Sequence, residues 1–268
     1  MVLADSCFNL THESFEKDFD QVLNNARTNS VHYLFSPSSK ESEIETLLKY
    51  SETINNLYVG IGIHPHNASE LKPKTFDRLK EYSKHPSVRA IGEIGLDYYR
   101  NFQSPSAQKK CFEMHLELAL ELKLPVFLHH RDSFHDFYPI LKNYIDKIPQ
   151  SIVHCFTGTE KELKSFLELD LCIGVTGWIC DLKRGKELRE LIEEALKLNV
   201  GARKKIKGQR DLADRVVAIL QEYLDSFILL AYDIEGNPVQ IKAARSAQQH
   251  EALNSILIKY FSSEVGRM

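Results

Sequence analysis

Apolar and polar positions along the first 175 residues repeat with two alternating periods. Short, mostly apolar runs indicate strands that are buried on both faces. Between them, apolar residues recur at helical spacing, as Phe15, Phe19, Val22 and Leu23 do. The expected strands are residues 2–4, 31–35, 57–63, 88–91, 125–128, 151–153 and 171–175. The expected helices are residues 12–29, 42–54, 74–84, 106–123, 134–147 and 160–169.

Seven strands that alternate with helices through short connections predict an α/β fold in which βα units close into a TIM-like barrel. The order of elements changes after this region. A helix over 182–199 precedes a basic stretch over 201–210, and then come a helix over 211–226, a β-hairpin over 227–245 and a helix over 246–261. We therefore expect a barrel over residues 1–200, with its last strands atypical, and a divergent helix–hairpin–helix segment over 201–268.

Charged side chains follow several of the predicted strands. In the stretch VRAIGEIGLDYYRN, Glu93 comes directly after an apolar run that breaks at Gly92, so the strand is expected to end near this carboxylate. Two other strands end in His129 and His154, and an earlier one ends in GIHPH. Catalytic groups of parallel α/β barrels lie at the carboxyl ends of the strands. A carboxylate and several imidazoles at these ends predict a hydrolytic metal site.

Composition limits the partners and the cellular location that we expect for the chain. The net charge is −3, so a nucleic-acid partner has to be held by a local site rather than by a global basic field. The five cysteines lack CxxC spacing, which is typical of reduced thiols. The N-terminus does not read as a signal peptide, and we find no apolar run of about 20 residues that would span a membrane. These features predict a cytoplasmic protein, or a nuclear one if the source is eukaryotic.

Six segments in a fixed order resemble the TatD family of metal-dependent nucleases, within the amidohydrolase-like TIM barrels. They are DSCFNLT, GIHPH, AIGEIGLDYYRNF, PVFLHHRD, HCFTGT and GVTGWICDLKRGKELREL. The resemblance covers about residues 1–195 and fades after that. It implies a (β/α) metallo-hydrolase fold and a deoxyribonuclease or exonuclease activity that hydrolyses phosphodiester bonds, 3′ to 5′, on single-stranded DNA or RNA ends.

The matching motifs imply that Glu93, His129 and His154 are metal ligands, and that His64 and His66 lie in the pocket. Mg²⁺ is the expected ion, with Mn²⁺ or Zn²⁺ as alternatives. Of the adjacent His129 and His130, only one can point inward, and we expect it to be His129. The family's TDxPY motif is absent. Asp233 follows an apolar run and is a candidate for the missing acidic ligand, although the same run also reads as one half of the hairpin.

Other polar residues near the strand ends have two open interpretations each. His64 acts as a general acid or only packs in its loop. Asp97 orients a histidine or caps the loop after Leu96. Arg131, expected with His64 and His66 among the catalytic residues, holds a substrate phosphate or pairs with a carboxylate.

Asp5 and Asn9 are expected beside the site, where Asp5 coordinates or hydrogen-bonds. Because the last acidic ligand is missing, two other functions stay open. One is a catalytically impaired variant that serves as a binding or regulatory protein. The other is an amidohydrolase that acts on a small molecule.

Overall fold

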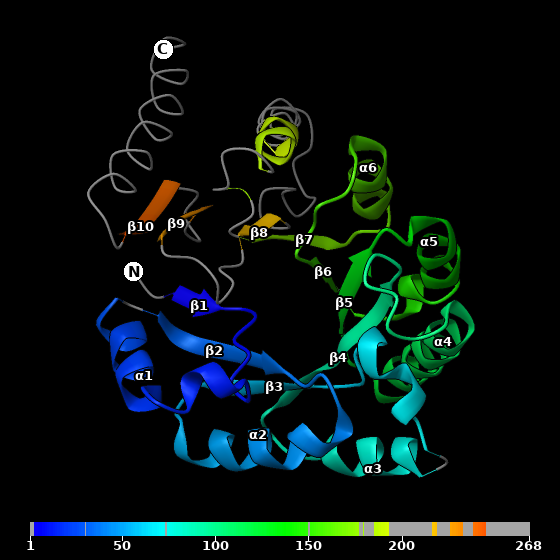
Figure 1. Ribbon diagram of the computed structural model, residues 1–268, viewed down its shortest axis with the longest axis horizontal. Helices are drawn as coiled ribbons and strands as arrows, with labels where there is room; N and C mark the ends of the chain where they lie inside the picture. Colours follow the sequence, from blue (N-terminus) through cyan, green and yellow to red (C-terminus); the bar gives the residue numbers. More distant parts are fainter. Residues whose placement is uncertain are drawn as a thin grey trace. The chain divides into compact units, whose positions relative to one another are not determined.

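The structure is a computed structural model, shown in Figure 1 with colours that follow the sequence. It describes residues 3–29, 31–72, 74–149, 151–176, 179 and 185–192, and the backbone of 216–218, 226–232 and 238–244. The chain divides into two compact units, Met1–Gly174 and Val175–Met268. The boundary that the sequence predicts, near residue 200, falls inside the second unit.

A parallel sheet runs through the first unit in chain order. Each strand from β2 to β7 lies parallel beside the strand that precedes it. Figure 1 shows these strands curling into part of a barrel. The prediction of an α/β, TIM-like arrangement of parallel strands is therefore confirmed. The strands are β1 (Leu3–Asp5), β2 (Val31–Pro37), β3 (Leu57–Ile61), β4 (Val88–Asp97), β5 (Val126–Arg131), β6 (Ile152–His154) and β7 (Cys172–Val175).

Helices connect the strands and lie on the outer side of the curled sheet (Figure 1). Their ends follow the sequence closely; Thr159, for example, forms a capping box with Glu162 at the start of α6. The helices are α1 (Phe19–Thr28), α2 (Glu41–Thr53), α3 (Thr75–Tyr82), α4 (Pro105–Leu122), α5 (Phe134–Lys142) and α6 (Glu160–Glu168). Three short 3-10 helices cover Glu13–Phe15, Pro65–Glu70 and Ile145–Lys147.

The predicted elements of the first unit differ from the structure in two ways. The first concerns helices: the helix expected over residues 134–147 ends at Lys142 and is followed by the 3-10 helix Ile145–Lys147. The single helix expected over residues 12–29 is a 3-10 turn followed by α1, which begins only at Phe19. Phe15 nevertheless packs against Phe8, with ring centroids 4.9 Å apart. The apolar spacing therefore reported burial correctly, although it overestimated the length of the helix.

The second difference concerns β4, which does not end near Gly92 but continues to Asp97. Gly92 and Gly95 allow this because both have positive φ angles, +152° and +145°, and lie flat against β5. A Cβ atom at Gly92 would lie 2.5 Å from the carbonyl oxygen of Phe127, and one at Gly95 would overlap the carbonyl of His129. Glu93 therefore lies within β4 rather than at its carboxyl end.

The core of the first unit includes the apolar face of α4. Phe112 is buried there and stacks on Phe137 of α5, with ring centroids 5.0 Å apart. The buried His115 accepts a hydrogen bond from the backbone N–H of Ile63 (3.2 Å), and its Nδ1 donates to the carbonyl of Cys111 (2.7 Å). This stripe of α4 therefore belongs to the core.

In the second unit, the structure describes a helical segment over residues 186–192 and three strands. β9 (Ser226–Tyr232) and β10 (Pro238–Ala244) pair antiparallel, with Tyr232 opposite Pro238, so the predicted hairpin is confirmed. The helix expected over residues 211–226 is wrong at its centre, where two adjacent β-branched valines belong to β8 (Val216–Ala218). The helix expected over 246–261 lies outside the described residues. Within the described part of the chain, no helix has the length and apolarity needed to cross a membrane.

Candidate metal centre

Three neighbouring strands and one loop bring four side chains to a single place. Glu93 comes from β4, His129 from β5 and His154 from β6. The strand register places His129 beside His154, and it places Gly95 beside His129. His64 comes from the loop after β3, where it caps the 3-10 helix Pro65–Glu70. Residues that lie up to 90 positions apart in the sequence therefore meet because their strands are neighbours.

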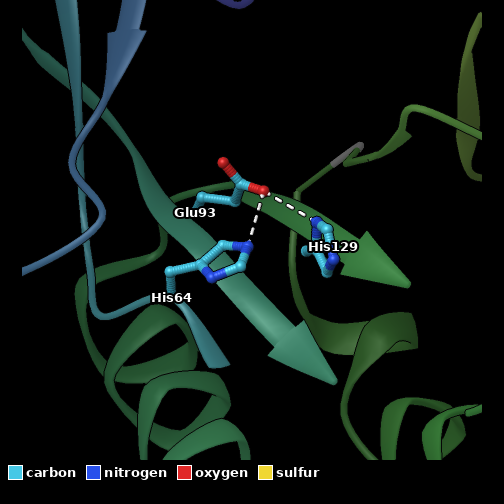
Figure 2. A group of neighbouring side chains, drawn as sticks. All are labelled: His64, Glu93 and His129. Atoms are coloured by element: carbon cyan, nitrogen blue, oxygen red, sulfur yellow. Dashed lines mark hydrogen bonds and ion pairs between the residues drawn. The ribbon is translucent and has the colours of Figure 1, made fainter. Parts of the chain in front are cut away.

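The three histidine rings converge on one oxygen atom of the fourth side chain, Oε1 of Glu93. His154 Nε2 lies 2.6 Å from it, His129 Nδ1 2.8 Å and His64 Nε2 3.2 Å. Figure 2 shows Glu93 between His64 and His129, with dashed lines to both rings. The ligand atoms of these three residues lie within 4.8 Å of one another. All four residues are buried or nearly so.

The charges of this group depend on one another. Burial disfavours the charged form of Glu93, but electrostatic interaction with the nearby His154 and His64 and hydrogen bonds from His129 and His154 hold its pKa well below the usual value. Burial likewise opposes the charge on His129, yet hydrogen bonds to Asp97 and Glu93 outweigh it and raise its pKa to about 9. Burial lowers the pKa of His64 to about 4. Without a metal, Glu93 is therefore an ionised carboxylate, His129 is an imidazolium and His64 is a neutral imidazole.

Asp97 binds two of the site histidines through the same oxygen, Oδ2. This atom lies 2.7 Å from His66 Nε2 and 3.3 Å from His129 Nε2. Its other oxygen, Oδ1, accepts a hydrogen bond from the backbone N–H of Arg100 (2.9 Å). Although Asp97 is buried, hydrogen bonds from His129, His66 and Arg100 lower the pKa of its carboxyl group. Asp97 thus both orients histidines and caps the following loop, so the two open interpretations hold together.

The end of β2 also holds the site in place, through the SPSS segment. The backbone N–H of Glu93 donates to the carbonyl of Ser38 (3.2 Å), and that of His64 donates to the carbonyl of Ser39 (2.8 Å). The buried Ser38 hydroxyl donates to the carbonyl of Gly62 and accepts from its N–H, both at 2.9 Å. The sequence analysis missed the role of this segment in positioning the site.

Gln108 and Gln103 were missed as well. Gln108 is fully buried in α4; its Oε1 accepts from the N–H of Asp97 (2.9 Å) and its Nε2 donates to the Asp97 carbonyl (3.1 Å). The side chain of Gln103 donates to the carbonyl of His66 (3.0 Å). A buried glutamine in an apolar helix stripe was the signal that could have revealed this role, because such a group needs partners.

Sequence comparison places these residues in a known family. The sequence model described as "TatD related DNase" matches residues 4–200. A protein from Klebsiella pneumoniae named "3′-5′ ssDNA/RNA exonuclease TatD" is 40% identical over 190 residues, which are 71% of this chain and 72% of that protein. The chain belongs to the TatD-related DNase family. A protein of the same name from Erwinia tasmaniensis is 43% identical over 191 residues, covering 71% of this chain and 74% of that protein.

Solved structures of TatD proteins share the fold. A hydrolase of the TatD family from Entamoeba histolytica superposes with a TM-score of 0.66 at 26% identity, covering 82% of this chain and 73% of that chain. A TatD homologue from Escherichia coli, YjjV, superposes with a TM-score of 0.68 at 23% identity, covering 89% and 84%. The predicted resemblance to the TatD family is confirmed.

The TatD motifs correspond to the centre seen in the structure. Glu93, His129 and His154, expected as ligands, lie within hydrogen-bond distance of one another, and His64 joins them. A carboxylate and imidazoles are donors that divalent ions of the first transition row accept. The ligand atoms of His64, Glu93 and His129 lie within 4.8 Å of one another, so the donor set present suits a divalent metal. The described residues give no support to the expectation of impaired catalysis.

The remaining candidates of this TatD protein lie around the centre or outside the described part. Arg131 ends β5, and its guanidinium lies over the ring of Tyr99, 4.7 Å from the centroid. Asp5 ends β1 and accepts a hydrogen bond from the N–H of Cys7 (3.0 Å). Asn9 is half-buried in the loop after β1. Asp233 lies outside the described residues.

His130 occupies the opposite face of β5 from His129. Its buried ring packs edge-on against Phe137 (5.1 Å) and Phe166 (5.4 Å), under the helices. Burial lowers its pKa to about 4, so the ring is neutral at pH 7. The strand alternation therefore explains why only the first of two adjacent histidines reaches Glu93.

Proposed function

We propose that this chain is a metal-dependent 3′-5′ exonuclease that hydrolyses phosphodiester bonds at the ends of single-stranded DNA or RNA. The relatives named as TatD exonucleases support it, because about 40% identity extends over the region that carries the centre. The observation on which the proposal depends is the convergence of His64, His129 and His154 on one oxygen of Glu93.

Glu93, His129 and His154 are the proposed metal ligands, with His64 as a fourth donor. Mg²⁺ is the proposed ion, and the imidazole content also suits Mn²⁺ or Zn²⁺. When bound, such an ion polarises a phosphoryl oxygen and lowers the pKa of a bound water. Asp233 is proposed as a further acidic ligand from its sequence context, with a role that only the intact chain can test.

The other residues of the centre orient groups and move protons. Asp97 holds the rings of His66 and His129 in fixed orientations through its Oδ2 atom. His66 has a side chain that is 20% exposed, so it is proposed to exchange a proton with the leaving oxygen of the substrate. The ring of His64 is neutral because burial lowers its pKa to about 4. We therefore propose that its free nitrogen lone pair binds either a proton or the metal. Arg131 is proposed to contact a substrate phosphate.

The proposal can be tested with a 3′-end-labelled single-stranded oligonucleotide in Mg²⁺ or Mn²⁺. The native chain is expected to remove 3′ nucleotides, and Glu93→Ala and Glu93→Gln are expected to abolish the cutting. Both variants should also bind Mn²⁺ more weakly in calorimetric titrations. Glu81→Ala is the matched control, because this carboxylate is exposed and pairs only with Lys84. Absence of cutting by the native chain, or full activity of both Glu93 variants, would refute the proposal.

A further inference from the structure

Two large aromatic rings are exposed on the loop that leads from β4 to α4, over residues 98–104. Tyr99 is 65% exposed and Phe102 is 66% exposed. Among the side chains that the structure describes, only one other large hydrophobic residue is exposed, Tyr33 of β2, at 42%. Two exposed rings on one loop make this loop a candidate binding surface.

The loop places these rings beside the metal centre. The ring of Phe102 packs edge-on against His66, with centroids 4.8 Å apart, and His66 binds Asp97. Asp97 in turn binds His129 of the centre. Phe102 is therefore connected to the reacting region through three successive direct contacts.

Tyr99 combines an aromatic face with positive charge. The guanidinium of Arg131 lies 4.7 Å from the centroid of its ring, which is the geometry of a cation–π contact. Arg100 is about half exposed on the same loop. The chain as a whole carries a net charge of −3, so two arginines beside two exposed rings are a local feature.

Partly buried hydrogen bonds join the loop to the elements around it. Gln108 donates to the carbonyl of Gln103 (2.8 Å), and Asp97 accepts from the N–H of Arg100 (2.9 Å). The hydroxyl of Tyr98 donates to Asp136 (2.8 Å). The exposed rings therefore stand on a loop that is ordered before any ligand arrives, which lowers the entropic cost of binding.

We propose that Tyr99 and Phe102 form a stacking platform for the unpaired bases next to the scissile 3′ end, with Arg131 and Arg100 beside the phosphates. Every base has a flat π-face, so stacking tolerates any sequence but requires unpaired bases. The platform rests on the nuclease function proposed above and gives it a physical basis for preferring single strands.

Binding of a 5′-fluorescein single-stranded decathymidylate, measured by anisotropy in EDTA so that no cutting occurs, tests the platform directly. Tyr99→Ala and Phe102→Ala are each expected to weaken binding about 10-fold, since one stacked base is commonly worth a factor of about 5 to 150. Phe102→Leu should weaken it similarly, because leucine keeps an apolar contact with His66 but has no π-face. Tyr33→Ala is the control and should bind as the native chain does. Unchanged affinity in both alanine variants would overturn the platform.

The same oligonucleotide with three abasic nucleotides at its 3′ end distinguishes stacking on the bases from a role of the rings in keeping the loop folded. The native chain should bind the abasic strand about as weakly as Phe102→Ala binds the intact strand. The affinity of Phe102→Ala should fall little further when the bases are removed. Fully additive losses would show that the ring does not contact those bases. All variants replace exposed side chains, and circular dichroism tests whether each of them folds.

Cutting assays in Mg²⁺ or Mn²⁺ distinguish failure of the platform from failure of the nuclease function. Cutting by the native chain with an unchanged KM in both alanine variants overturns the platform and leaves the nuclease. If removal of the rings or of the 3′ bases weakens binding but the native chain does not cut, the platform is supported and the nuclease function is refuted. A KM that rises about 10-fold in both alanine variants supports both.

Discussion

Gln108→Leu is expected to destabilise the protein and to disturb its active centre from a distance. The amide of Gln108 is fully buried and makes three hydrogen bonds, two to the backbone of Asp97 and one to the carbonyl of Gln103. Leucine has a similar size and suits a helix, but it can make none of these bonds. The substitution therefore removes polar contacts and leaves the apolar packing of α4 largely unchanged.

The size of the effect follows from these three bonds. A hydrogen bond contributes about 1 kcal/mol net, and a buried backbone group left without a partner costs about 1–3 kcal/mol. Burial of the leucine side chain offsets part of the loss. We expect the free energy of unfolding to fall by about 2–4 kcal/mol. Because Asp97 then loses its anchor, and with it the orientation of His66 and His129, kcat/KM should fall about 10- to 100-fold.

Urea denaturation followed by circular dichroism at 222 nm measures the first effect, and degradation of a labelled single strand measures the second. Gln21→Leu is the matched control, because Gln21 is exposed in α1 and bonds only to the side chain of Asn25 (2.8 Å). The control should change stability by less than about 0.5 kcal/mol. An equally small change in Gln108→Leu, together with native kcat/KM, would refute the reasoning.

Two further predictions concern histidines. His129→Ala should lower kcat/KM at least about 100-fold and His130→Leu less than about threefold, because the ring of His129 contacts Glu93 whereas that of His130 packs against Phe137; equal losses would contradict this. Burial lowers the pKa of His115 to about 4, so its stabilising contribution is complete above pH 6.5 and declines by about 3 kcal/mol as pH falls to 4. Urea denaturation of the metal-free protein at a series of pH values, with His115→Gln as the reference, measures this decline. If the free energy of unfolding depends on pH equally in both proteins, the prediction is excluded.

Local patterns in the chain were sufficient for the fold class and for most candidates of the centre. The alternation of apolar runs and helical stripes predicted β1–β7, with boundaries close to those observed except at the end of β4. Glu93, His129 and His154 were predicted because polar groups after apolar strands share one edge of a parallel sheet. The two-residue period of a strand indicated that only one of His129 and His130 points inward, and the resemblance to the family motif indicated His129.

Long-range packing decided everything that depends on distances between elements. The extension of β4 past Gly92, which places Glu93 within the strand, depends on the close approach of β5. The grouping of three rings around one Glu93 oxygen and the support of Asp97 by Gln108 join residues that are 11 to 61 positions apart. Periodicity reports which face of an element is buried, but hydrogen bonds between elements form only at the geometry that tertiary packing sets.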